Sequence, residues 1–145
     1  MNAPLYNTTI LRLAATIPHV GRLPQPHASS EKRSPVCGSR VIVDVEVDAD
    51  GRVSAIGQEV RACALGQASA NLMASGAIGR SPEELAVARD ALTAWLADER
   101  DDPGDWPGLD IFAPARPHKA RHASIRLAFE AVAEAAEQAS RGRRG

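Results

Sequence analysis

The stretch "RVIVDVEVDADGRVSAIGQEV", residues 40–60, carries the clearest structural pattern in this chain. Valine occupies the odd positions from 41 to 47, and the even positions up to 48 carry mostly acidic side chains. Alternation with a period of two is typical of a strand with one buried face. The glycine turn "DADG", residues 48–51, follows, and a second strand is predicted from about Arg52 to Val60. We therefore expect an antiparallel hairpin whose odd-numbered valines face the core.

Apolar residues before the hairpin recur with the spacing of a helix. Intervals of four, three and four positions separate the members of one predicted helix face, which are Tyr6, Ile10, Leu13 and Ile17. Pro18 should end this helix. Residues 18–35 are rich in serine, proline and histidine, which favours a loop with at most a short edge strand entering Val36.

Two further helices are predicted directly after the hairpin. The small residues of "CALGQASANLMASGAIG", residues 63–79, favour a helix that Gly76 or Gly79 stops. Ser81 and Glu84, with a proline at the first helical position, form a capping box that opens the next helix. This helix is expected to run to about Glu99.

The rest of the chain is predicted as a loop and a last helix. "DDPGDWPG", residues 101–108, is typical of a surface loop, and the last helix is expected from about His122 to Ala139. The order of elements predicts an α+β fold, with a small antiparallel sheet of about three strands covered on one face by helices. A chain of 145 residues suits a single domain, 1–145, with frayed ends at 1–4 and 140–145.

The composition bounds the class of protein. The formal net charge is −1 and aromatic residues make up 3%, which argues against a surface for nucleic-acid phosphates or stacked bases. No apolar run approaches the roughly 18 residues that a membrane helix needs, and the N-terminus lacks the pattern of a signal peptide. Two cysteines in such a chain are more often free thiols or ligands than a disulfide. We expect a cytoplasmic protein that binds neither nucleic acid nor membranes.

Two cysteines and one histidine lie at the ends of predicted elements. Cys37 precedes the first strand in "PVCGSR", Cys63 stands where the second strand meets a helix in "VRACALG", and His122 opens the last helix in "RHASIR". The free N–H groups at a helix N-terminus favour the thiolate, which is the form that binds soft metals. Two thiolates and an imidazole suit zinc, or iron bound to sulfide. The spacing contains no CxxC, so two unrelated half-buried thiols and a capping or surface histidine stay open as alternatives.

The order of these motifs resembles the NifU/IscU-type iron–sulfur cluster scaffold family. In that family a Cys-Gly-Asp precedes a strand, a cysteine lies at a strand-to-helix junction, and a His-Cys pair opens the last long helix. "PVCGSR" is similar to the first motif, "GRVSAIGQEVRACALGQASANLM" to the second and "RHASIRLAFEAV" to the third. The opening helix followed by "PHVG" also resembles the start of that family, so the resemblance covers about residues 5–136.

The resemblance implies a function and a set of ligands. It implies a non-enzymatic scaffold or carrier that holds an iron–sulfur cluster through Cys37, Cys63 and His122, with a zinc-binding module or a metal-free interaction domain as alternatives. Ser39 stands where the family has aspartate, and Ala123 where it has a third cysteine. The implied partners are a cysteine desulfurase as sulfur donor and apo acceptor proteins. The family's chaperone-binding segment is matched only loosely by "ARPHKAR", so the resemblance gives only weak support for a chaperone as a further partner.

Overall fold

The predicted hairpin forms two strands of a three-stranded antiparallel sheet. The computed structural model of the protein describes residues 5–35 and 38–144. Strands β1 (Ala28–Arg33), β2 (Arg40–Val47) and β3 (Val53–Arg61) lie side by side in chain order. The odd-numbered valines from 41 to 47 are at most 2% exposed, which confirms that they face the core. The edge strand expected to enter Val36 is β1, and it ends at Arg33.

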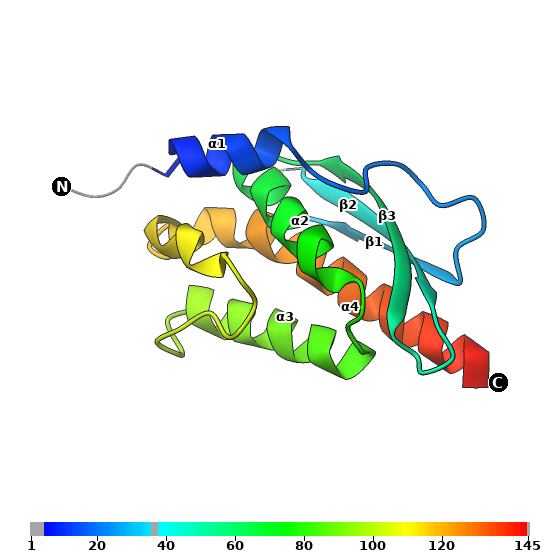
Figure 1. Ribbon diagram of the computed structural model, residues 1–145. Coiled ribbons are helices and arrows are strands. Elements are labelled where there is room, and N and C mark those ends of the chain that lie inside the picture. Colours follow the sequence, from blue (N-terminus) through cyan, green and yellow to red (C-terminus); the bar gives the residue numbers. More distant parts are fainter. Residues whose placement is uncertain (1–4, 36–37, 145) are drawn as a thin grey trace.

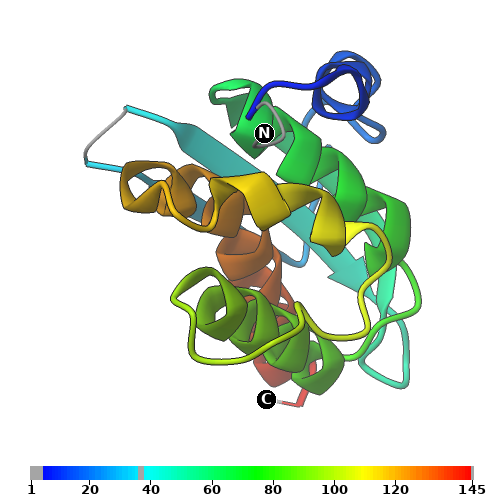
Figure 2. The same cartoon turned by 90° about the vertical axis from the view of Figure 1, so that its left-hand side faces the viewer.

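Helices cover one face of this sheet, as the sequence predicted (Figures 1 and 2). They are α1 (Thr8–Ala15), α2 (Ala64–Ala77), α3 (Pro82–Leu96) and α4 (His122–Arg144), with two 3-10 turns, η1 (Leu109–Ala115) and η2 (Lys119–Arg121). Helix α4 packs on β1 and β2, α2 packs on β3 and α4, and the other two helices pack outside them. The α+β prediction is therefore confirmed. No helix in the described part of the chain has both the length and the apolar character needed to cross a membrane.

The predicted capping box opens α3. Ser81 accepts a hydrogen bond from the Glu84 amide, and the Glu84 carboxylate accepts one from the Ser81 amide. The hydrogen bond from the Ser81 amide and the Arg52 guanidinium 2.6 Å away lower the pKa of Glu84 to about 2. Helix α2 ends at Ala77, and the following turn uses Gly79 at a φ of +92°, which glycine adopts without strain.

Trp106 corrects the prediction that residues 101–108 form only a surface loop. Its ring is 5% exposed and lies edge-on to Phe129, with ring centres 5.2 Å apart. The indole N–H donates to the Leu72 carbonyl oxygen at 2.8 Å. Gly76, inside α2, has no side chain where the indole approaches. With so few aromatic residues in the chain, this loop contributes one of its largest rings to the core.

The segment between α1 and β1 runs past the sheet on the side away from α3 (Figure 1). The Gly21 backbone N–H donates to the Gln58 backbone carbonyl oxygen at 2.8 Å, and the Gln58 backbone N–H donates to the His19 carbonyl oxygen at 3.1 Å. These bonds hold the segment along the free edge of β3. Gly57 has no side chain where the Gly21 carbonyl oxygen passes, so the segment can cross onto the outer face of the sheet.

Asp44 anchors this segment to the outer face of the sheet. Its side chain is fully buried and accepts hydrogen bonds from Arg22 Nε at 2.7 Å, from the Ser29 hydroxyl at 2.5 Å and from the Leu23 amide at 3.0 Å. Burial alone would raise the pKa of Asp44, but the hydrogen bonds outweigh it and lower the pKa. The carboxylate is thus a charged group with all its partners supplied by the crossing segment and β1.

Candidate functional site

Two of the three predicted ligands lie within the described residues. Cys63 is the N-cap of α2, partly buried and free, and its thiol makes no capping hydrogen bond. His122 is the first residue of α4 and is 8% exposed, so the alternative of a solvated surface histidine is wrong. Cys37 lies outside the described residues, and its role stays a prediction.

The His122 ring is held by two backbone carbonyls at the end of η1. Its Nε2 lies 3.1 Å from the Ala115 oxygen and 2.9 Å from the Arg116 oxygen. A carbonyl oxygen can only accept, so Nε2 carries the proton and Nδ1 of the neutral ring keeps its lone pair. Histidines that bind metals almost always donate the other ring N–H to an acceptor of this kind. The two carbonyls therefore orient the ring through Nε2.

The first turns of α2 and α4 pack against each other. Gly66 has no side chain, and a Cβ there would lie 3.1 Å from the Ser124 carbonyl oxygen. Ser69, on the next turn, donates to the Ile125 carbonyl oxygen at 2.5 Å. Glycine and serine allow this close approach because they place little bulk between the helices. Cys63 and His122 therefore open two helices that touch within their first turns.

The start of β2 reaches the same region through Ser39. The Ser39 hydroxyl lies 3.2 Å from the Ser124 hydroxyl, and both side chains are buried. Ser39 stands two positions after Cys37, and Ala123, partly buried, lies between His122 and Ser124. The chain that follows Cys37 is thus joined to the helix turn that carries His122, at the same end of the molecule as the start of α2.

A row of arginines crosses the outer face of the sheet beside this region. In the strand register Arg40 of β2 lies opposite Arg33 of β1 and Arg61 of β3. The three line a hollow of about 580 Å³, and the other lining residues within the described part of the chain are Ser34, Pro35, Gly38 and Ser39. No sequence motif predicted this row, although each arginine stands within four positions of Cys37 or Cys63. Closeness to the two cysteines is visible in the sequence, but only the pairing register of all three strands shows that the arginines lie in one row.

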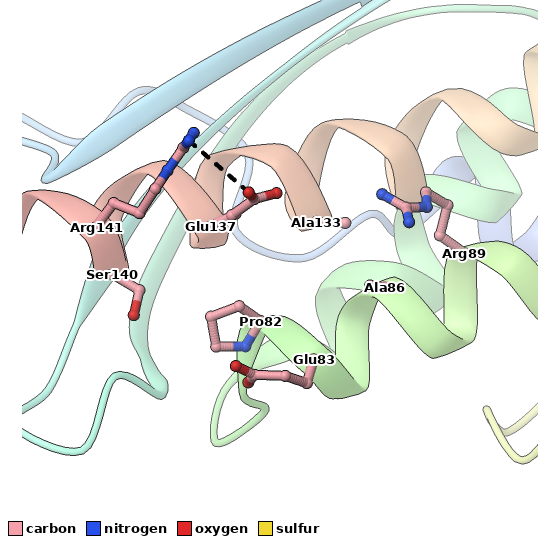
Figure 3. A pocket seen from close by; sticks show the side chains of 8 residues that line it. All are labelled: Pro82, Glu83, Ala86, Arg89, Ala133, Glu137, Ser140 and Arg141. Carbon is pink, nitrogen blue, oxygen red and sulfur yellow. Dashed lines mark ion pairs between the residues drawn. The ribbon is translucent and has the colours of Figure 1, made fainter.

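A smaller hollow lies near the other end of α4, against α3 (Figure 3). It holds about 360 Å³ and is lined by Pro82, Glu83, Ala86, Arg89, Ala133, Glu137, Ser140 and Arg141. Arg141 and Glu137 point toward each other across one helix turn, 3.9 Å apart. Within residues 5–35 and 38–144, neither this hollow nor any other place gathers three His, Cys, Asp or Glu side chains around a possible metal position.

Comparison with solved structures finds proteins with the same fold. The N-terminal part of a nitrogen-fixing NifU-like protein from Brucella abortus is 40% identical to this chain. The match covers 94% of this chain and 95% of the Brucella chain, with a TM-score of 0.88. A protein of Fervidobacterium islandicum AW-1, proposed as an iron–sulfur cluster assembly scaffold for the SUF system, shares the fold at 19% identity and a TM-score of 0.83, over 91% of this chain and 96% of its own. No protein-family model and no curated protein sequence matches the chain.

The Brucella relative decides the family, because an identity of 40% extends over nearly the whole of both chains. The sheet order, the helix-covered face and the position of Cys63 at the start of α2 agree with the motifs on which the resemblance rests. This chain belongs to the NifU/IscU-type family.

Proposed function

We propose that this protein holds an iron–sulfur cluster during its assembly and passes it on, with Cys37, Cys63 and His122 as the ligands. The observation that carries the proposal is the His122 ring, which is buried and donates Nε2–H to the Ala115 and Arg116 carbonyls, the arrangement in which the neutral ring has its lone pair on Nδ1. Two thiolates and an imidazole form a donor set that suits iron bound to sulfide. The cluster is cargo, and in this proposal the chain itself catalyses no reaction.

The family and the helix contacts support the same function. The Fervidobacterium relative is described as a cluster assembly scaffold, and the Brucella relative is NifU-like. Gly66 and Ser39 both contact Ser124, one from α2 and one from the start of β2. Ligand bonds to one metal are only about 2.0–2.3 Å long, so a shared site requires such close neighbours.

Two positions of the family motif supply no strong ligand here, and a zinc site with the same three ligands is the second candidate. The Ser39 hydroxyl is engaged with Ser124, and Ala123 has no donor atom. Cys37, Cys63 and His122 would leave one of four coordination positions for water, a small thiol or a side chain of a partner. A cluster completed in this way would be held less firmly than one with a third cysteine.

The test is anaerobic reconstitution of the purified protein with ferrous iron and sulfide, followed by visible absorbance and by metal and sulfide analysis. In a second arm, cysteine and a cysteine desulfurase replace free sulfide, which tests the proposed sulfur donor. His122→Gln is the deciding variant, because a glutamine amide can still donate to the two carbonyls while Nδ1 is lost. His118→Gln is the matched control, since His118 is exposed on the nearby loop.

The parent and the control should gain visible absorption and iron with sulfide. His122→Gln should lose its cluster to a chelator about tenfold faster. Mixing the loaded protein with an apo iron–sulfur protein should then transfer the cluster, as expected for a carrier. Zinc without sulfide or colour would favour the second candidate. A folded His122→Gln protein that keeps its cluster as long as the parent would contradict the ligand assignment.

A further inference from the structure

We propose that the arginine row, Arg33, Arg40 and Arg61, is a docking surface for an acidic segment of a partner protein. The proposal goes beyond cluster binding and does not depend on it, because the row lies on the outer face of the sheet. The chemistry that would recognise this surface is a run of carboxylates.

The register places the three arginines on one face of the sheet. Arg40 lies between Arg33 and Arg61 as a direct cross-strand neighbour of each. Neighbours of these arginines along the strands, Val41 and Val60, belong to the opposite, helix-covered face, because successive side chains alternate. Adjacent strands are about 4.8 Å apart, so the row presents three guanidinium groups across roughly 10 Å.

The row carries more positive charge than its surroundings neutralise. Glu31 is 2.6 Å from Arg33 and 3.8 Å from Arg40, so one carboxylate serves two guanidinium groups. Arg61 is exposed and makes no ion pair or hydrogen bond with any side chain among the described residues. Glu59 shares this face one row further along β3 but makes no ion pair with Arg61 within that part of the chain. Like charges directly opposite each other destabilise a sheet, so added carboxylates would relieve the row.

The shape of the hollow favours a peptide segment over a single small anion. The arginines line about 580 Å³ together with Ser34, Pro35, Gly38 and Ser39. A guanidinium group pairs with one carboxylate through two hydrogen bonds, so a small anion with one carboxylate would engage only one arginine. Three guanidinium groups in a line match several carboxylates carried on one peptide chain. Side chains on the same side of an extended chain are about 6.6 Å apart, so alternate acidic residues can reach neighbouring arginines of the row. A partner with clustered Asp or Glu residues is the occupant that this charge pattern fits.

The test measures binding of fluorescein-labelled hexaglutamate to the full, metal-free chain by fluorescence anisotropy, with labelled hexaglutamine as the neutral probe. The triple variant R33Q/R40Q/R61Q removes the row. A matched triple variant, R12Q/R100Q/R141Q, removes the same charge from exposed arginines elsewhere on the surface. Arg61→Glu is the second test variant, because it places a carboxylate opposite Arg40 and should leave folding intact. Circular dichroism confirms that each variant is folded.

The parent should bind hexaglutamate but not hexaglutamine, and more weakly at about 150 mM than at about 50 mM salt. R33Q/R40Q/R61Q and Arg61→Glu should each lose about tenfold or more in affinity, and the matched triple variant should stay within about twofold of the parent. Equal losses in both triple variants, or no binding by the parent, would overturn the proposal. Equal competition by free glutamate or by a thymidine hexanucleotide at the same anion concentration would also overturn it, because the surface would then bind small or polymeric anions generally.

Discussion

The Ser39 hydroxyl lies 3.2 Å from the Ser124 hydroxyl, and this buried contact joins two segments that are 85 positions apart in the chain. Ser39 directly precedes β2, and Ser124 is the third residue of α4. Since His122 opens the same helix turn, the contact ties the position of a predicted ligand to the sheet. The serine that replaces the aspartate of the family motif thus has a structural partner in this chain.

A double-mutant cycle on Ser39→Ala and Ser124→Ala should measure this contact. Both serines make further interactions, so each single variant is expected to lose about 0.5–1.5 kcal/mol of unfolding free energy. The double variant should lose less than the sum of the two, with a coupling energy of about 1 kcal/mol. Urea unfolding monitored by circular dichroism gives the four values. Additive losses would show that the two hydroxyls do not depend on each other.

Ala123→Cys should lengthen the lifetime of a reconstituted cluster. Ala123 directly follows His122 and is partly buried near the start of α4, where one added sulfur should change stability by less than about 1.5 kcal/mol. The new thiolate would supply the third cysteine of the family motif. The measurement is the decay of visible absorbance against a chelator under anaerobic conditions.

Ala120→Cys is the control for this variant, because it adds an exposed thiol in η2 outside the motif. The control should lose its cluster at the parental rate. If Ala123→Cys folds normally and shows no slower decay than Ala120→Cys, position 123 is not part of the ligand set.

Asp44→Asn should destabilise the protein at neutral pH and have little effect in acid. The folded state lowers the pKa of Asp44, so its carboxylate contributes stability above about pH 4 and loses that contribution as the pH falls through the lowered pKa. Removing the charge from a buried group that pairs with Arg22 should cost about 1–3 kcal/mol at pH 7. Unfolding in urea at pH 7, 5 and below 4 would follow the difference between parent and variant.

Asp90→Asn serves as the acidic control for this series, since Asp90 is exposed and pairs with the neighbouring Arg89. It should stay within about 0.5 kcal/mol of the parent throughout. A constant difference between the parent and Asp44→Asn from neutral to acid pH would contradict the charge-based role of Asp44.

Gly76→Ala should destabilise the protein, although alanine is the better helix former. A Cβ at position 76 would lie 2.8 Å from Trp106 Cζ2, so the buried indole would have to move. Such overpacking costs about 1–3 kcal/mol, which exceeds the gain of about 0.5–1 kcal/mol from helix propensity. Urea unfolding monitored by circular dichroism would measure the loss, and tryptophan fluorescence would report the displaced ring.

Gly142→Ala is the matched control, because Gly142 lies in α4 with no atom within 4 Å of the added Cβ. Alanine there should stabilise the protein by about 0.5–1 kcal/mol. The opposite signs of the two changes are the expected result. Equal stabilisation at both positions would mean that Trp106 does not require the glycine.

Local patterns were sufficient for the hairpin of β2 and β3 and for the four α-helices, but not for β1, η1 or η2. The alternating valines predicted the hairpin and its buried face, and Ser81 with Glu84 predicted the start of α3, because these signals act between residues a few positions apart. The same reasoning could not place Trp106, whose partners Leu72 and Phe129 are distant in the chain. Of the predicted ligands, Cys63 and His122 lie at adjoining helix starts, and Cys37 stays a prediction from its motif.

The sequence by itself determined the β2–β3 hairpin, the four α-helices and the family that the motifs resemble, since all three depend on the spacing of residues close together in the chain. Only the tertiary structure decided that Arg40 faces Arg61. The register shift at Glu46 and Val47 moves the pairing of β2 with β3 by one residue, and without it Arg40 would lie opposite Val60. The tautomer of His122 was decided in the same way, because the carbonyls that accept its Nε2–H come from a 3-10 turn whose path depends on packing against the rest of the chain.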